Sequence, residues 1–310
     1  VVTARLIDQS YDKCYRITSS GNNVEKYHLS VDIPASRELK LVLKNLTITP
    51  AEAIAPIQIN GESQVTTYLE GKNKISINKS EKSSSPAGIS VAKGAKLTID
   101  SEPEQQGSIE VLNNTNVTRS GAAIGGNGEQ DAGIIHIKGG TVIAKMTDYN
   151  PRGAAIGASA GKSVEEIRIS GGVVTAKGSW GAGIGTGSAD SQERTGKIVI
   201  EGGTVNASSW SGAGIGSGFG YVPGSSAIIA KIEIHGGMIT AYSYDGACIG
   251  SGRDSSSSVL IDGGTICLVK KNNESGRNAA HIGKGYESTK APTDVTITGG
   301  TICLIGADRN

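Results

Sequence analysis

Aromatic residues are scarce in this chain of 310 residues, which contains two Trp, nine Tyr and one Phe. Because hydrophobic residues still make up 37% of the sequence, a core must consist mainly of Ile, Val, Leu and Ala, which disfavours helix-rich classes. Charge is scarce too: charged residues make up 19%, and the net charge is +1. The sequence therefore lacks the charge excess of a disordered chain, the basic face of a nucleic-acid-binding protein and the polybasic run of a membrane-surface protein.

Long hydrophobic runs and clustered cysteines are also missing. No apolar stretch approaches the roughly 18 residues that span a bilayer, and no signal-type segment follows Val1, so we expect a mature or excised fragment without a membrane span. Cys14, Cys248, Cys267 and Cys303 form no CxxC pair and no Cys/His group with zinc spacing. We therefore predict no metal site and no cofactor, and no EF-hand or calcium nonapeptide motif supports bound calcium.

Glycine, by contrast, is abundant at 45 residues and recurs within a repeated phrase. The phrase is GAxIG or a close variant, and its copies lie at 121–125, 153–157, 181–185, 212–216, 246–250 and 279–283. A Gly-Gly pair recurs in phase with it at 139–140, 171–172, 202–203, 236–237, 263–264 and 299–300. Successive copies of the phrase are 28 to 34 residues apart, which predicts a structural repeat of about 30 residues.

Short alternating segments flank each Gly-Gly pair. The segments IIHIK, EIRIS, KIVIE and KIEIH precede it in four repeats, and TVIA, VVTA, TVNA and MITA follow it. A period of two with many β-branched residues indicates strands. Each repeat therefore predicts one coil of an all-β, single-stranded, right-handed parallel β-helix, which is a β-solenoid with coils of about 30 residues.

The alternation also assigns the faces of these strands. We expect isoleucines before the Gly-Gly pair, such as Ile135, Ile167 and Ile198, to point inward and stack coil over coil. Val142 and Val174 should do the same after the pair. This arrangement explains why glycine occurs at the corners, because a corner between stacked strands requires positive φ or a close main-chain approach.

The glycine phrases fade upstream of residue 120, but the alternating segments continue, for example in LKLVLKNLTI and KLTID. We therefore assign residues 37–310 to the parallel β-helix. Residues 1–36 lack the repeat spacing, and an open solenoid end exposes strand edges that must be covered. We interpret residues 1–36 as an N-terminal cap and first coil.

The phrases GAGIG and GGTV, preceded by LKLVLKNLTIT and AGISVAKGAKLTID, resemble the Gly-rich right-handed parallel β-helix modules of bacterial secreted and cell-wall-anchored surface proteins. The resemblance covers roughly residues 35–305. It implies a pectate-lyase-like β-helix fold and a carbohydrate-binding or adhesive role at the cell surface. Some members of this family bind calcium, and a few relatives act on glycans, so the resemblance is specific for fold and weak for function.

Aromatic and acidic residues gather just before the GAxIG corners: Asp148, Tyr149, Trp180, Trp210, Tyr242, Tyr244 and Asp245. Rings placed one coil apart would form a strip on which the apolar faces of sugar rings pack, while the carboxylates bind sugar hydroxyls. The sequence therefore predicts a ligand-binding strip at these positions. The alternative is that the rings only shield the core at a corner.

The loops after the corners vary in length and charge and offer a second set of ligand contacts, including Tyr221 and Arg253. Variable loops on one edge of a rigid scaffold commonly carry specificity. The alternative is that they are ordinary solvated turns.

A catalytic alternative rests on outward carboxylates. Glu201, His235 and Asp262 occupy the same outward position in successive coils, at spacings that suit paired glycosidase carboxyls. Further candidates are the aspartates near the corners and loops, namely Asp148, Asp190 and Asp245. A row of mixed charges equally keeps an exposed strand soluble, and no aspartate cluster aligns with Arg168 for lyase chemistry.

Two cysteines share one slot of the repeat, because Cys267 and Cys303 both end a GGTIC segment. Stacking should bring their Cα atoms near 4.8 Å, so two free thiols and one disulfide both remain open. Cys248 lies in a GACIG corner, where we expect it to be buried.

These observations favour a secreted or cell-surface β-helix module that binds a polysaccharide or a host glycan through the aromatic strip, within a larger surface protein. The alternative is a polysaccharide-active enzyme on the same scaffold, either a glycoside hydrolase or, with less support, a lyase. A purely structural stalk and an ice-binding face of threonines are further readings, but the outward threonines form no unbroken column.

Overall fold

The computed structural model describes residues 3–6, 14–19, 27–81, 84–102, 104, 106–128, 130–147, 150–188, 194–220, 228–270, 279–286 and 293–306. Over these residues the chain forms strands, turns and bends but no helix, which confirms the predicted all-β class. Accordingly, none of them belongs to a helix long and apolar enough to cross a membrane.

Three parallel sheets run the length of the molecule, and each coil contributes one strand to each in turn. The ten-stranded corner sheet contains β1 (Thr3–Leu6), β3 (His28–Val31), β6 (Ile57–Ile59), β10 (Ile89–Val91), β14 (Ile124–Gly125), β17 (Ile156–Gly157), β20 (Ile184–Gly185), β23 (Ile215–Gly216), β26 (Ile249–Gly250) and β29 (Ile282–Gly283). The repeated Ile-Gly of the GAxIG phrase is therefore the strand itself in the last six members.

The ten-stranded pre-glycine sheet holds the strands that end before the Gly-Gly bends or at the equivalent place. It contains β2 (Cys14–Thr18), β4 (Glu38–Lys44), β7 (Gln64–Glu70), β11 (Lys96–Asp100), β15 (Ala132–Ile137), β18 (Val164–Ile169), β21 (Arg194–Ile200), β24 (Ile228–Ile234), β27 (Ser256–Ile261) and β30 (Thr293–Ile297). The segments predicted as strands before Gly-Gly are thus strands.

The nine-stranded post-glycine sheet follows the bends. It contains β5 (Thr47–Ile48), β8 (Lys72–Ile77), β12 (Ser108–Asn113), β16 (Thr141–Met146), β19 (Val173–Lys177), β22 (Thr204–Ser209), β25 (Met238–Ser243), β28 (Thr265–Lys270) and β31 (Thr301–Gly306). A separate two-stranded sheet pairs β9 (Ser84–Ser85) with β13 (Arg119–Ser120).

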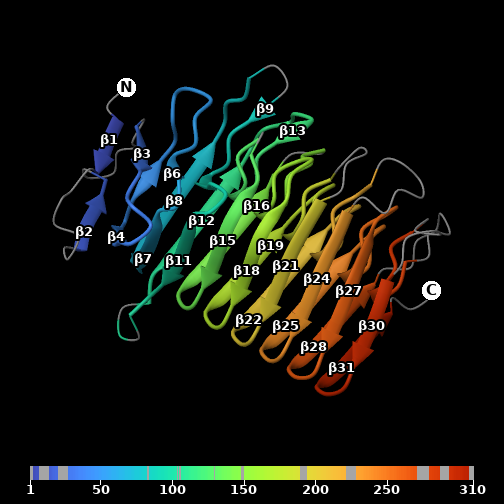
Figure 1. The fold of residues 1–310 in the computed structure, drawn as a ribbon. Coiled ribbons are helices and arrows are strands. Elements are labelled where there is room, and N and C mark those ends of the chain that lie inside the picture. Colours follow the sequence, from blue (N-terminus) through green and yellow to red (C-terminus); the bar gives the residue numbers. More distant parts are fainter. Residues whose placement is uncertain are drawn as a thin grey trace.

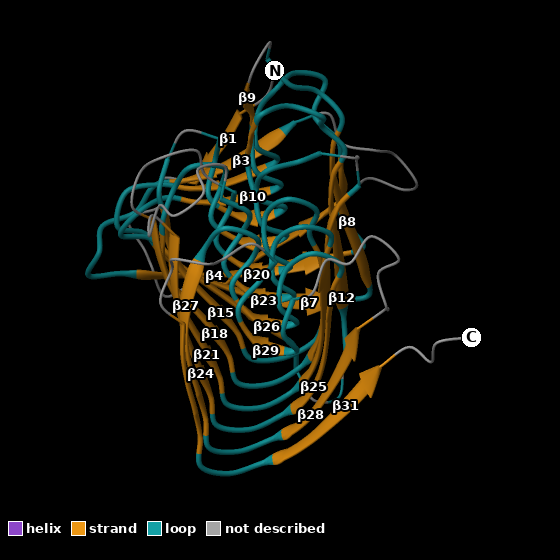
Figure 2. Ribbon diagram, turned by 90° about the vertical axis from the view of Figure 1, so that its right-hand side faces the viewer, coloured by secondary structure: helices purple, strands orange, loops and turns teal. Residues whose placement is uncertain are grey.

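The coils stack side by side from the N-terminal to the C-terminal end, so the two termini lie at opposite ends of the stack (Figure 1). Neighbouring strands pair in parallel, and Figure 2 shows the three sheets as separate walls around the interior. The predicted β-solenoid is therefore confirmed. Strands β1, β2 and β3 pair with later coils in the same sheets, so the coil pattern already begins within residues 1–36.

Aliphatic columns fill the interior, as the alternation predicts. Ile135, Ile167 and Ile198 pair in register on successive coils and are fully buried. Val142 and Val174 form the matching column of the post-glycine sheet and are also fully buried. Continuous burial of branched aliphatic side chains supplies the main stabilisation of a fold with so few aromatic rings.

The final glycine of each GAxIG phrase allows neighbouring coils to approach closely. Gly185 has φ of +141°, and a Cβ there would lie 1.9 Å from the carbonyl oxygen of Gly216. Gly157 and Gly216 repeat this geometry in the adjacent coils. Any other residue would be excluded both by backbone strain and by the next coil.

A column of side-chain hydrogen-bond donors lies on the inner side of the corners. The hydroxyls of Ser209 and Ser243 donate to the carbonyl oxygens of Gly181 and Gly212, at 2.8 and 2.7 Å. In the next coil the Nζ of Lys270 makes the equivalent bond to Gly246 at 2.6 Å, and burial lowers the pKa of this ammonium group. Each bond satisfies a carbonyl that the tight corner removes from water.

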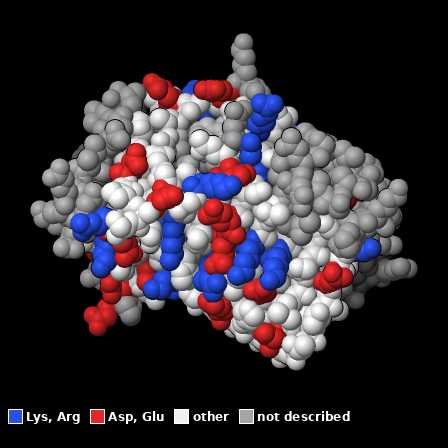
Figure 3. Space-filling view, in the orientation of Figure 1, with Lys and Arg blue, Asp and Glu red and all other residues white. Residues whose placement is uncertain are grey.

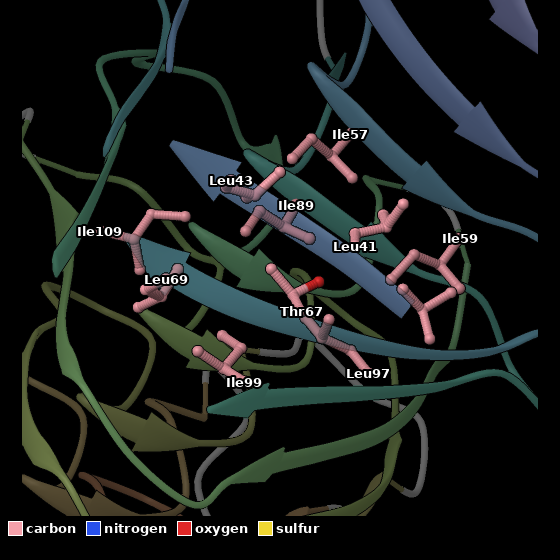
Figure 4. Close-up of a pocket in the computed structure, with 11 residues that line it drawn as sticks. Leu41, Leu43, Ile57, Ile59, Thr67, Leu69, Ile89, Leu97, Ile99 and Ile109 are labelled. Atoms are coloured by element: carbon pink, nitrogen blue, oxygen red, sulfur yellow. The ribbon is translucent and has the colours of Figure 1, made fainter. Parts of the chain in front are cut away.

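The core of the N-terminal coils contains a small void. Aliphatic side chains surround this void of about 10 Å³, and Thr67 is its single polar lining residue (Figure 4). Thr67 pairs in register with Leu41 and Ile99, so its hydroxyl interrupts an otherwise aliphatic column.

Candidate functional site

The aromatic positions before the corners lie on successive coils, as the repeat spacing predicts. Trp210 donates its backbone N–H to the carbonyl of Ser179 at 3.1 Å, and Tyr244 donates to Ser209 at 3.3 Å. These residues follow directly after the strands of the post-glycine sheet. The main-chain ladder therefore brings Trp180, Trp210 and Tyr244 to the same edge of the solenoid.

The rings do not form one continuous strip. Trp210 stacks on Tyr244, with ring centroids 4.3 Å apart and an interplanar angle of 18°. Trp180 instead packs edge-on against Phe219, at 5.5 Å and 79°. The reason is that Phe219 enters from the loop after the next corner, where its N–H bonds to the Trp180 carbonyl at 2.8 Å. The predicted strip is thus divided between two aromatic pairs.

A cleft of about 410 Å³ lies at the divide between the two pairs. Its lining residues come from the ends of the post-glycine strands and the turns that follow them: Met146, Thr147, Asn150, Lys177, Gly178, Ser179, Trp180, Ser208, Ser209, Trp210 and Tyr242. Three of the predicted ligand-binding residues, Trp180, Trp210 and Tyr242, are therefore brought together. The volume falls in the ordinary range of small-molecule sites.

Trp210 is the most exposed ring of this site, with 50% of its surface accessible. Tyr244 lies one coil further along and covers one face of Trp210, yet Tyr244 is absent from the cleft lining. Tyr244 therefore supports the indole from behind. This stacking fixes the orientation of Trp210 and leaves its other face for a ligand.

Tyr242 adds a phenolic hydroxyl to the cleft. It stands in register with Ser208, which in turn pairs with Lys177 on the preceding strand. Partial burial, and then the neighbouring Tyr244, raise the pKa of Tyr242 above its ordinary value. The hydroxyl is therefore protonated at neutral pH and can both donate and accept hydrogen bonds.

Asp245, which the sequence predicts as a ligand contact, does not line this cleft. Its side chain is 2% exposed and accepts a hydrogen bond from the Ser211 hydroxyl at 3.2 Å. Its backbone carbonyl accepts the N–H of Tyr286 at 3.0 Å. Asp245 thus joins neighbouring turns behind the aromatic residues.

Arg253 lies between two rings rather than in the cleft. Its guanidinium carbon is 5.4 Å from the centroid of Phe219 and 5.5 Å from that of Tyr286. Arg152 occupies a similar position 5.6 Å from the Trp180 ring. These cation–π contacts link the loops of successive coils along the edge beside the cleft.

The predicted catalytic column lies on another wall, the pre-glycine sheet. The backbone N–H of His235 bonds to the carbonyl of Ile200, and that of Asp262 bonds to Ile234, so Glu201, His235 and Asp262 are stacked as predicted. His235 Nδ1 lies 2.8 Å from Asp262 Oδ1.

Neighbouring basic side chains pair with the carboxylates of this wall. Arg168 bridges Glu166 and Glu201, while Lys197 lies 3.1 Å from Glu166. Figure 3 shows Lys and Arg interleaved with Asp and Glu across the charged face. Alternating charges of this kind keep an exposed parallel sheet soluble.

Two carboxylates on this wall, Glu166 and Glu233, have pKa values below their ordinary value. Burial opposes ionisation of Glu166, but hydrogen bonds from Arg168 and Lys197 outweigh it and hold its pKa below the usual value. Lys231 similarly lowers the pKa of Glu233. A general acid requires the opposite shift, so these two groups are unsuited to donate protons near neutral pH.

Four of the predicted site residues, Asp148, Tyr149, Asp190 and Tyr221, lie outside the described residues. Among the described residues, no group of three or more His, Cys, Asp and Glu side chains is arranged to hold a metal ion.

The sequence analysis missed Asn150, Lys177 and Ser208, which supply polar groups to the cleft. The repeat pattern could have identified two of these residues. Lys177 and Ser208 occupy the same outward position after the Gly-Gly bend as Tyr242, so repeat register alone placed all three in one column. Asn150 follows a loop of variable length and carries no such signal.

Comparison with known proteins supports the repeat and no more specific assignment. A family model described as Beta helix repeat matches residues 135–160, 167–188, 198–219 and 232–253. No curated protein and no solved structure gives a significant match to the chain. Each of the four matched segments begins in a pre-glycine strand, passes through the Gly-Gly bend and includes the next corner. The chain is thus a parallel β-solenoid that contains β-helix repeats.

Proposed function

We propose that the chain is a glycan-binding module whose ligand occupies the cleft between Trp180 and Trp210. The observation that carries the proposal is the joint lining of this cleft by two indoles, the Tyr242 phenol and the polar groups of Asn150 and Lys177. Sugar rings have apolar C–H faces that pack on aromatic surfaces, and hydroxyls that need donors and acceptors nearby. The cleft offers both kinds of contact within one small volume.

The rigidity of the site supports binding. Trp210 is stacked on Tyr244, and Trp180 is packed against Phe219. Both tryptophans also bond through their backbone N–H groups to the preceding coil. Because these rings are already fixed, a ligand loses little affinity to the ordering of side chains.

The arrangement supports binding over hydrolysis. Glycoside hydrolases generally use two carboxyl groups on either side of the scissile bond. The described lining of the cleft contains no Asp or Glu. Glu201 and Asp262 lie on the pre-glycine sheet, whereas the cleft lies at the end of the post-glycine sheet.

The proposal extends to the setting of the protein. A polysaccharide or host glycan is the partner, and a secreted or cell-surface location within a larger adhesive protein is the context in which such a ligand is met. A stiff solenoid is suited to this role because it presents the cleft at a fixed place along an extended stack of coils.

The test is retention on a panel of polysaccharides and host glycans, with released reducing ends and unsaturated products assayed in the same samples. Trp210→Ala should weaken retention on the order of 30-fold, as expected when an exposed aromatic anchor is removed. Trp180→Ala should act in the same direction.

Tyr286→Ala is the matched control, since Tyr286 contacts Arg253 on the same edge but does not line the cleft. It should leave retention unchanged, and circular dichroism should show all three variants folded. Equal retention by Trp210→Ala and the parent chain would contradict the proposal. New sugar products would instead support the enzymatic alternative.

A further inference from the structure

Two cysteines face each other across the last coils of the described structure. Cys267 lies in β28 and Cys303 in β31, and the two are direct register partners of parallel strands. Both are free thiols; Cys303 is exposed and Cys267 is partly exposed. They occupy the outward position of the post-glycine sheet that Thr240 holds one coil earlier.

The two thiols are neighbours in this register. Partial burial, and then the neighbouring Cys303, raise the pKa of the Cys267 thiol above its ordinary value. Register partners in parallel strands stand about 4.8 Å apart, within the Cα range over which disulfides form. The Cα separation therefore permits a bridge in this register.

The strand that carries Cys303 lies at one edge of its sheet. Among the described strands, β31 pairs with β28 alone. The inward side chain of Leu304 is 57% exposed, whereas its register partner Leu268 is fully buried. A cross-link between β28 and β31 would restrain opening of β31 directly.

The other two cysteines are not placed to compete. Cys248 is fully buried, and its Sγ lies 3.3 Å from the carbonyl of Val269. Cys14 lies in β2, at the opposite end of the stack. The register therefore selects a single pair.

We propose that Cys267 and Cys303 form a redox-sensitive pair that an oxidising small-molecule disulfide converts into a bridge between β28 and β31. The bridge fastens the last coil to the one before it. The reduced pair leaves that coil held by main-chain hydrogen bonds and by its partly covered aliphatic side chains.

The exchange balances with one disulfide oxidant such as oxidised glutathione. The thiolate of the exposed Cys303 attacks one sulfur of the oxidant, which forms a mixed disulfide and releases the first glutathione thiolate. Cys267 then loses its proton and attacks the Cys303 sulfur, which releases the second. The protein pair loses two electrons and two protons, and the oxidant becomes two molecules of glutathione.

The test treats the full chain with oxidised glutathione and maps the disulfides by proteolysis and mass spectrometry. A Cys14→Ser background removes the other exposed thiol. We expect one linked peptide pair containing residues 267 and 303 and a mass lower by two hydrogens. Protection of the β31 amides from hydrogen exchange should rise on the order of 100-fold and return to the starting value on reduction.

Cys303→Ser and Cys267→Ser are the matched controls, because each keeps the register while leaving a single thiol of the pair. Neither should show the increase in protection. Three outcomes overturn the proposal: a product that keeps one glutathione on Cys303, a bridged product whose β31 amides exchange as fast as before, or disulfide-linked dimers as the main product.

Discussion

One column of the corner sheet differs between the N-terminal coils (residues 3–120) and the C-terminal coils (residues 121–306). In the N-terminal coils it contains Ser30, Gln58 and Ser90, paired in register. Ser90 then pairs with Gly125, and from there every member is glycine, through Gly157 and its successors: Gly185, Gly216, Gly250 and Gly283. Both halves continue the same sheet.

The difference shows that the GAxIG phrase is not required for the solenoid to form. The N-terminal coils build the corner sheet from strands of three or four residues, such as Ile57–Ile59, which carry side chains throughout. The C-terminal coils reduce each corner strand to Ile-Gly and let successive main chains meet. Parallel pairing in register continues from coil to coil through both halves. Glycine allows the close main-chain approach at the C-terminal corners.

The largest effect should come from adding a methyl group to the glycine column. Gly185→Ala combines a positive φ with a Cβ 1.9 Å from the Gly216 carbonyl, so we expect a loss of at least about 4 kcal/mol in the free energy of unfolding. Urea unfolding followed by circular dichroism measures it.

Two control variants separate the causes of that loss. Gly283→Ala keeps a positive φ, +117°, but its Cβ would meet nothing closer than 3.6 Å, so it should cost clearly less than Gly185→Ala. Ser90→Ala, in the same column of the N-terminal half, should cost about 1 kcal/mol or less. Equal losses at Gly185 and Ser90 would contradict the distinction between the two halves.

A smaller effect should come from the buried donors that close the C-terminal corners. Ser243→Ala removes a hydroxyl that donates to the Gly212 carbonyl at 2.7 Å and accepts from the Gly246 N–H at 3.0 Å. Leaving these groups buried without partners should cost about 1–3 kcal/mol, measured by the same unfolding experiment. Thr240→Ala, on the outward face of the same strand, should change stability by less than about 0.5 kcal/mol. The role of the donors would be rejected if the two variants unfolded alike.

Much of this architecture could be predicted from the sequence because it depends on local alternation and on a repeated spacing. Strands on both sides of the Gly-Gly bends, the inward isoleucines and the burial of Cys248 all follow from a period of two or from the repeat, and all are confirmed. The register of Cys267 with Cys303 follows in the same way. Their free thiol state depends on chemistry that spacing does not specify.

The candidate site was only partly predictable. Trp180, Trp210 and Tyr242 were placed correctly on one edge, since each stands at a fixed distance from a corner. The partners of the rings were not predictable, because Phe219 reaches Trp180 from the turn after the following corner, where the preceding repeat has Ser188 at the equivalent position. Asp245 is buried because neighbouring turns cover it. Its place in the repeat relative to the corner did not indicate these contacts.

The smallest effect should come from the N-terminal core, at the void beside Thr67. Thr67→Val keeps the side-chain shape and removes the hydroxyl from the void shared with Leu41 and Ile99, so we expect a gain of about 1 kcal/mol in the free energy of unfolding. Thr66→Val is the control on the outward face, where loss of the hydrogen bond to Glu38 should lower stability instead. A loss in both variants would mean that the Thr67 hydroxyl is satisfied in the native core, and that the two halves differ at their corners but not in the quality of their packing.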